Sequence, residues 1–206
     1  ISYLAVAHLW DGVTTRTPSS VYRWNPEGSR LLENGKRLVG TGFEWHQDLV
    51  DTMAASDVNF YSFINTSGLL VVANSQSTAD IGNGGGSVGI FELNATSNRF
   101  EKIQSLESVG AADVEPFSIS GEGEFLAIAH RQSGSFVLPP AEKHRDDPIW
   151  EAETSIYDQD SVIWKWDASE RQFSIYQRLG ANISTVSETG GSIIDRLRGV
   201  TGFKAF

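Results

Sequence analysis

The chain has no cysteine among its 206 residues, and this absence removes several kinds of site at once. Disulfide bridges and thiolate metal sites are excluded, and so is catalysis by a cysteine nucleophile. The sequence also lacks any apolar run near the roughly 20 residues that a membrane-spanning helix requires. We therefore expect no membrane insertion of this segment.

Positive charge is scarce as well. Lysine and arginine together number 16, against 26 aspartates and glutamates, so the formal net charge is −10. Without a basic surplus to neutralise phosphates, nucleic acid and anionic membranes are poor candidates for the main partner. A cation or a basic protein surface would suit this charge better. The 40% of hydrophobic and 20% of charged residues are typical of a globular protein.

What the sequence does contain is an internal repeat. The first repeated motif is a short apolar run that ends in His or Asn. It reads YLAVAH at 3–8, LLVVAN at 69–74 and FLAIAH at 125–130. Apolar residues on both faces of such a run indicate a strand buried on both sides.

Three further motifs follow in a constant order. The second reads VYRWN at 21–25, IFELN at 90–94 and IWKWD at 163–167. Its first four residues suit a strand, and the final Asn or Asp suits a turn. The third reads FEKIQSL at 100–106 and FSIYQRL at 173–179, with a looser first copy expected at 31–38. The fourth reads DVNFYSF at 57–63, DVEPFSI at 113–119 and VTGFKAF at 200–206.

Four short strands in each of three tandem units predict an all-β fold made of about three four-stranded antiparallel β-propeller blades. The repeat units are approximately 1–63, 64–119 and 120–206 of a single region. A β-sandwich whose strands look alike by chance is the alternative. Because a propeller needs about four blades to close, we expect a fragment of a larger propeller with further blades. A ring assembled from several chains is the other possibility.

These motifs resemble the epilepsy-associated repeat, or EPTP repeat, a family that includes the LGI proteins and a thrombospondin-type laminin G domain protein. The match is closest at 125–130, 161–166 and 173–179, and GAADV at 110–114 resembles the family's Gly-Ala-x-Asp segment. The third copy departs from the pattern because it lacks the Asp of the other two. The resemblance implies a seven-bladed propeller in extracellular or secreted proteins that recognises protein partners.

Strand direction alternates within an antiparallel blade. The link from the second to the third strand and the link from the fourth strand to the first strand of the next blade therefore emerge on the same face. Both are long here. They run about 8–20, 74–87 and 131–161, with short helices expected at 46–54 and 192–198. Long loops on one face of a rigid scaffold usually carry binding, so we expect this face to be functional.

The link at 131–161 is acidic and contains one tryptophan, which could anchor a protein partner. The candidate partner-binding residues are His144, Asp146, Asp147, Trp150 and Glu151. A solvated insertion without a binding role is the alternative interpretation.

Asp57 and Asp113 occupy equivalent positions at the start of the fourth motif, which forms the innermost strand of a blade. Both carboxylates are therefore expected at the central channel. Hard cations prefer oxygen ligands, so the pair could hold Ca²⁺ together with backbone carbonyls and water. The resemblance also points to a channel cation. The other interpretation is simple capping of the strand start.

Three glycosylation sequons, at Asn65, Asn94 and Asn182, favour a secreted glycoprotein. His8 and His130 share one repeat position with Asn74, which favours a structural polar role there over a metal or catalytic one. The leading hypothesis is an extracellular protein-interaction module without enzymatic activity. The alternatives are a secreted propeller enzyme acting on glycans and an architectural adhesion repeat.

Overall fold

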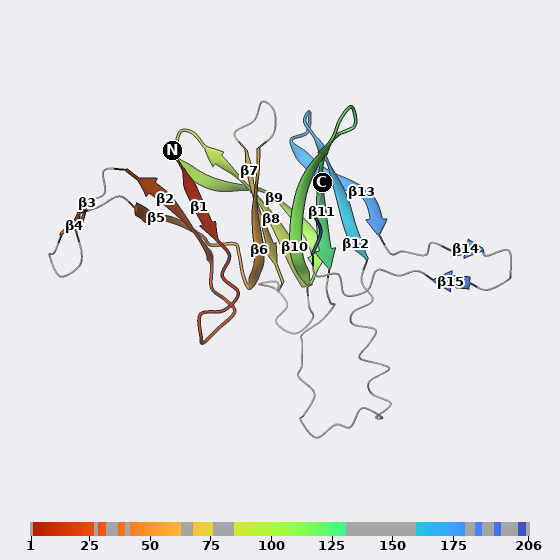
Figure 1. Cartoon of the computed structure of the whole chain (residues 1–206), viewed down its shortest axis with the longest axis horizontal. Coiled ribbons are helices and arrows are strands. Elements are labelled where there is room, and N and C mark those ends of the chain that lie inside the picture. Colours follow the sequence, from red (N-terminus) through yellow and green to blue (C-terminus); the bar gives the residue numbers. More distant parts are fainter. Residues whose placement is uncertain are drawn as a thin grey trace, which may run out of the picture.

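The computed structural model describes residues 2–26, 29–31, 37–39, 42–62, 68–75, 85–130, 160–179, 184–186, 192–194 and 202–204. Every regular element in these ranges is a β-strand, which confirms the predicted all-β class. Three antiparallel sheets of three or four strands lie side by side, and two short hairpins extend from the flanks (Figure 1).

The first sheet contains β1 (Tyr3–Val6), β2 (Ser19–Asn25) and β5 (Gly42–Leu49) in that order. The prediction of its outer strand at 31–38 is wrong. β3 (Ser29–Leu31) and β4 (Arg37–Val39) pair only with each other, and β5 takes the outer position. The helix expected at 46–54 is also wrong, because β5 continues to Leu49 and a turn follows.

The second and third sheets each have four strands in chain order. The second contains β6 (Ala55–Tyr61), β7 (Leu69–Asn74), β8 (Gly85–Asn94) and β9 (Arg99–Val109). The third contains β10 (Ala111–Ile119), β11 (Gly123–His130), β12 (Ser161–Asp167) and β13 (Gln172–Leu179). A hairpin of β14 (Ser184–Val186) and β15 (Ser192–Ile194) follows, so 192–194 is strand where a helix was expected, and 195–198 lie outside the described residues.

One irregularity recurs in all three sheets. The register between the last two strands slips by one residue after Val21, after Ile90 and after Ile163. These residues occupy the same place in the second motif. A bulge bends the strand and is a specific feature of a sheet, so its recurrence shows that the three sheets repeat one local structure.

The core lies between the sheets. Leu70, Val72 and Phe91 of the second sheet pack against the first, and Leu69, Val71 and Ile90 pack toward the third. All six residues of β7 are buried, as the apolar motif predicts for a strand covered on both sides. Burial of each Val, Leu or Phe side chain contributes roughly 1.5–3 kcal/mol to stability. Packing on both faces of the second sheet is therefore the main interaction that holds the three sheets together.

Glutamine side chains supplement this packing. Gln47 Nε2 donates to the carbonyl oxygen of Phe100 at 2.9 Å, and the Phe100 amide donates to Gln47 Oε1 at 2.8 Å. Gln104 makes the same two bonds to Phe173, each at 2.8 Å. Each glutamine thus joins the outer strand of one sheet to the outer strand of the next. We call this paired interaction the glutamine clasp.

Candidate functional site

The candidate residues of the longest link, His144, Asp146, Asp147, Trp150 and Glu151, lie outside the described residues. The two ends of that link are described. His130 Nδ1 lies 2.6 Å from the carbonyl oxygen of Asp160, so the chain leaves the third sheet and returns to it at one point. This point is at the same end of the sheets as the link between β1 and β2 (Figure 1).

His130 is held on both ring nitrogens. Its Nε2 lies 2.9 Å from Ser108 Oγ, and both side chains are only 5% exposed. Burial lowers the pKa of His130, which favours the neutral ring. A Ser–His pair of this geometry could transfer a proton, but its burial keeps a substrate away from Oγ.

The equivalent polar residues also hold the ends of links. His8 Nδ1 lies 2.8 Å from the carbonyl oxygen of Pro18, and Asn74 Oδ1 accepts a hydrogen bond from the Met53 amide at 3.0 Å. Contacts of this kind agree with the structural polar role inferred for this repeat position.

Asp57 lies on β6 and Asp113 lies on β10, each of which is an edge strand of its sheet. Each aspartate binds a backbone amide of the chain segment that follows its sheet. Asp57 Oδ2 accepts a hydrogen bond from the Val114 amide at 3.1 Å, and Asp113 Oδ2 accepts one from the Phe203 amide at 2.8 Å. Burial, with repulsion from Asp57, raises the pKa of Asp113. These bonds are of the backbone-capping kind.

A calcium ion at Asp57 and Asp113 stays a prediction. Within the described ranges, no group of three or more His, Cys, Asp or Glu side chains is placed to hold a metal ion. Each carboxylate already uses one oxygen on a backbone amide, so an ion there would depend largely on backbone carbonyls and water for its remaining ligands.

The same hydrogen bonds correct the alignment of the fourth motif. The Phe203 amide donates to Asp113 in the same way that the Val114 amide donates to Asp57, so Phe203 and Val114 are equivalent residues. Gly202 therefore occupies the place of the missing aspartate, two residues later than the sequence comparison put it.

The best-described part of the long-link face is the segment between β1 and β2. Asp11 Oδ1 accepts hydrogen bonds from the amides of Val13 at 2.8 Å and Thr14 at 2.7 Å, and the Asp11 amide donates to the Thr14 carbonyl at 3.2 Å. Gly12 between them has a φ of 97°, which favours glycine. These backbone hydrogen bonds lower the pKa of Asp11, so the turn is held by a charged acceptor at neutral pH.

This turn is fixed to the rest of the molecule. The Ala54 amide donates to the Thr15 carbonyl at 2.9 Å, and the Ala55 amide donates to the His8 carbonyl at 3.0 Å. The link after β1 is therefore tied to the start of β6. These two hydrogen bonds hold the link after β1 against the end of the link after β5.

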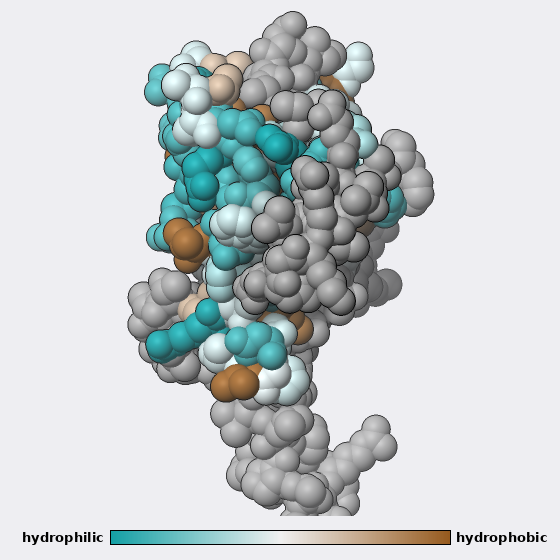
Figure 2. Space-filling view, turned by 90° about the vertical axis from the view of Figure 1, so that its left-hand side faces the viewer, coloured by the Kyte–Doolittle hydropathy of each residue, from teal (hydrophilic) through white to brown (hydrophobic). Residues whose placement is uncertain are grey.

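Large hydrophobic side chains project from these two links. Trp10 is 63% exposed and Val13 is 90% exposed. We define the Trp10 surface as Leu9, Trp10 and Val13 with Val50 on the link after β5, all of them exposed. Figure 2 shows the left-hand side of the molecule in Figure 1, and toward its lower end brown hydrophobic atoms lie beside near-white and teal ones.

The sequence predicted that the link between β1 and β2 lies on the functional face, but it favoured Trp150 over Trp10 as the anchor residue. The Asp-Gly pair at 11–12 is a sequence signal that predicts the turn beside Trp10.

Asn94 is the one described sequon residue, since Asn65 and Asn182 lie outside the described ranges. Its Oδ1 accepts a hydrogen bond from the Thr96 amide at 2.8 Å, and its Nδ2 donates to Glu101 Oε2 at 3.0 Å. Nδ2 is the atom that would carry a glycan. Glycosylation would replace one of the two hydrogens on Nδ2, so only one N–H would remain for the Glu101 contact, and glycosylation at Asn94 stays a prediction.

No helix in the described part of the chain is long and apolar enough to cross a membrane. No protein-family model matches the chain, and no curated protein matches it.

Proposed function

We propose that this chain is an extracellular protein-interaction module whose three sheets are blades of a propeller and whose binding surface is the long-link end. The observation that carries the proposal is Trp10, a largely exposed tryptophan beside a preformed Asp11 turn. Binding hot spots are enriched in tryptophan, and a rigid presenting loop reduces the entropy lost on binding.

The chemistry of the surface suggests the kind of partner. Trp10 and Val13 offer an apolar contact that would fit a hydrophobic pocket. The net charge of −10 favours a partner with a basic rim, because complementary charge steers association and increases its rate. The partner in this proposal is a protein with an apolar pocket bordered by lysine or arginine.

The proposal is tested by the binding of the fluorescently labelled chain to intact cells. Trp10→Ala should weaken binding by about 2 kcal/mol, or roughly 30-fold, if Trp10 is an anchor. Phe60→Ala is the matched control, because Phe60 is an aromatic residue of similar exposure, 55%, on a different strand, β6. Equal binding by wild type and Trp10→Ala would contradict the proposal.

A second variant separates the two parts of the long-link face. Deleting 135–158 removes most of the longest link while retaining the His130–Asp160 contact at its base. If the Trp10 surface is sufficient, the deletion leaves binding within a few-fold of wild type. If binding is lost on deletion and kept in Trp10→Ala, the partner site lies in the deleted link. If both variants bind as wild type does, the binding surface lies outside both parts of the long-link face. If wild type does not bind cells at all, the alternative of a purely architectural repeat is favoured.

A further inference from the structure

A buried histidine joins the second and third sheets through its side chain. His130 is the last residue of β11 in the third sheet, and its Nε2 lies 2.9 Å from Oγ of Ser108 on β9 of the second sheet. Both side chains are only 5% exposed. The contact lies inside the stack, between two sheets that are both described.

The hydrogen bonds of His130 define which ring nitrogen carries the proton. The carbonyl oxygen of Asp160, 2.6 Å from Nδ1, can only accept a hydrogen bond, so Nδ1 must be protonated. In the neutral ring, Nε2 then carries no hydrogen and accepts one from the Ser108 hydroxyl. Both ring nitrogens have a partner in this state. The neutral ring with its proton on Nδ1 is therefore the form that fits the site.

A second proton on the ring would reverse the direction of the contact with Ser108. Nε2 would become a donor, so the hydroxyl oxygen would have to accept from it and turn its own hydrogen away from the ring. The ring would also carry a positive charge where its side chain is 5% exposed. Burying a charge is costly unless the charge is paired. Protonation of His130 therefore weakens the contact between the sheets.

Two charged residues act on the His130 ring, and together they do not offset this cost. Burial has the largest effect and lowers the pKa of His130 below the ordinary value of 6.5. The carbonyl and the carboxylate of Asp160 raise the pKa, whereas the positive charge of Arg178 on β13 lowers it. The net result is a lowered pKa, so the folded chain favours the neutral ring.

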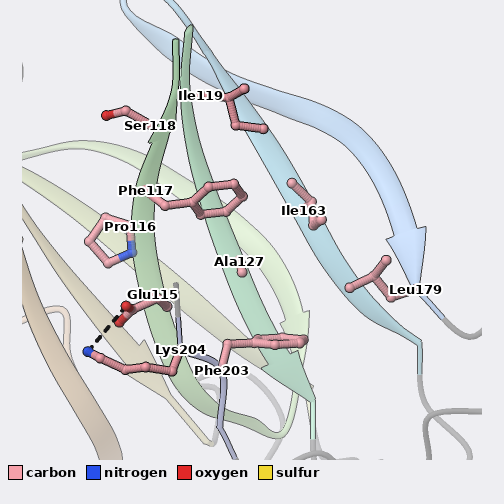
Figure 3. A pocket seen from close by; sticks show the side chains of 10 residues that line it. All are labelled: Glu115, Pro116, Phe117, Ser118, Ile119, Ala127, Ile163, Leu179, Phe203 and Lys204. Atoms are coloured by element: carbon pink, nitrogen blue, oxygen red, sulfur yellow. Dashed lines mark ion pairs between the residues drawn. The ribbon is translucent and has the colours of Figure 1, made fainter. Parts of the chain in front are cut away.

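The carboxylates on the other adjacent strands are directed elsewhere. On β9, Glu107 is exposed and projects from the side of the strand opposite to the buried serine. On β10, which pairs with the end of β11, Asp113 binds the next chain segment, and Glu115 forms an ion pair with Lys204 at 3.3 Å (Figure 3). These three carboxylates are therefore not positioned to neutralise a charge on His130.

The site gives the folded chain a pH dependence of definite sign. The folded state binds the second proton of His130 less tightly than the unfolded chain does. Stabilisation from this group is therefore complete above pH 6.5 and is lost as the pH falls from 6.5 toward the lowered value. Histidine is the side chain whose ordinary pKa lies in this range, so mild acidification is sufficient.

We propose that His130 is a pH-sensitive contact that holds the second and third sheets together at neutral pH and weakens in a mildly acidic environment. Acidification would loosen the end of β11 against β9, at the end of the stack where the long links emerge (Figure 1). Asn74 fills the same repeat position in the second sheet, bonded to the Met53 amide, so the fold does not require a titrating residue there. This inference is independent of the Trp10 surface.

The state of the ring can be measured in the wild-type 206-residue chain by long-range proton–nitrogen NMR of its histidines. The His130→Asn variant assigns the His130 signals. At neutral pH the ring should carry its proton on Nδ1, and it should take up the second proton with a midpoint below pH 6.5. A proton on Nε2 at neutral pH, or a midpoint at or above 6.5, would overturn the proposal.

Urea denaturation from about pH 8 to about pH 5 measures the effect on stability. The unfolding equilibrium constant of wild type, relative to that of His130→Asn, should increase on acidification by up to about tenfold per pH unit, the limit for one proton. His8→Asn is the matched control, because His8 has the same repeat position and a similar contact from Nδ1 to a carbonyl, at 2.8 Å, but is only half-buried. It should keep the pH dependence of wild type. Equal pH dependence of wild type and His130→Asn would overturn the proposal.

A further variant keeps the histidine and changes only its charged surroundings. Arg178→Gln removes the repulsion from β13, so the chain should lose less stability on acidification than wild type does. The measurement is made at low salt, because Arg178 is exposed and salt screens its charge. It remains informative if His130→Asn does not fold. A loss of stability equal to or larger than that of wild type would overturn the proposal.

Discussion

Gln104 on β9 holds both backbone polar groups of Phe173 on β13, at 2.8 Å each, across the boundary between two sheets. The bonded groups belong to an edge strand, whose unpaired N–H and C=O groups are otherwise open to other strands. Gln47 makes the same two hydrogen bonds to Phe100. With one side chain, the clasp therefore supplies partners for backbone groups of an edge strand and fixes the relative position of two sheets.

Removing the clasp should destabilise the stack. Gln104→Ala removes the two hydrogen bonds that Gln104 makes to the amide and carbonyl of Phe173 beside a buried ring, and we expect the free energy of unfolding to fall by about 2–3 kcal/mol. Urea denaturation, carried out at low protein concentration, measures this change. Gln177→Ala is the control and should change the stability of the monomer by less than about 0.5 kcal/mol. Equal stability of the two variants would show that the clasp does not hold the sheets together.

Tyr61 joins the second and third sheets through its hydroxyl group. The hydroxyl donates to the Phe117 carbonyl at 2.9 Å and also contacts Glu124, and burial raises the pKa of Tyr61 well above its usual value. Tyr61→Phe should lower the free energy of unfolding by about 1–2 kcal/mol, since the partly buried partners lose a donor. Tyr176→Phe, at a residue that is 55% exposed, should leave stability unchanged in the same assay. A Tyr61→Phe chain as stable as wild type would refute this assignment.

The raised pKa of Asp113 predicts a pH dependence of a definite sign. Because the folded state holds the proton more tightly than the unfolded state, stability from this group falls as pH rises from the ordinary value of 3.8 through the raised value. Asp113→Asn keeps an acceptor for the Phe203 amide and cannot titrate. The stability difference, variant minus wild type, should therefore increase with pH through this interval. A difference that is constant with pH would contradict the raised pKa.

The calcium prediction can be tested on the same pair. If Asp57 and Asp113 hold Ca²⁺ in the folded state only, calcium should raise the melting temperature of the wild type by mass action. Asp113→Asn should respond much less, because an amide is a weaker ligand than a carboxylate. Differential scanning fluorimetry with calcium, and with magnesium as a control, provides the readout. A wild-type melting temperature that calcium does not change would remove the metal site.

The repeat made the strands of the second and third sheets predictable, because their motifs are ungapped and their apolar runs are buried on both sides. The outer strand of the first sheet was missed for a local reason. The β3–β4 hairpin separates it from β2, and leucine spacing at 31–38 was followed instead of Phe43, Gln47 and Leu49, which match the third motif without a gap. A search for the phenylalanine and glutamine together would have found β5.

The contacts of the candidate site were less predictable. The glutamine clasp joins residues 53 and 69 positions apart, so no local pattern shows it. Asp57 and Asp113 were placed at strand starts by their repeat position, but their backbone partners lie in the next sheet or beyond it. Trp10 is exposed because its link is folded by Asp11 and fixed to Ala54 and Ala55, which depends on three-dimensional contacts.

The central claim, that the long-link end binds a protein, is tested most directly by site-specific photocrosslinking. A photoreactive phenylalanine replaces Trp10 in one chain and Phe60 in another, and each is irradiated on intact cells. We expect the position 10 chain to form a discrete adduct with a cell-surface protein, and excess unlabelled wild type to suppress it. The position 60 chain should give none. An adduct at position 60 alone, or none at position 10 while the labelled chain still binds the cells, would contradict the account.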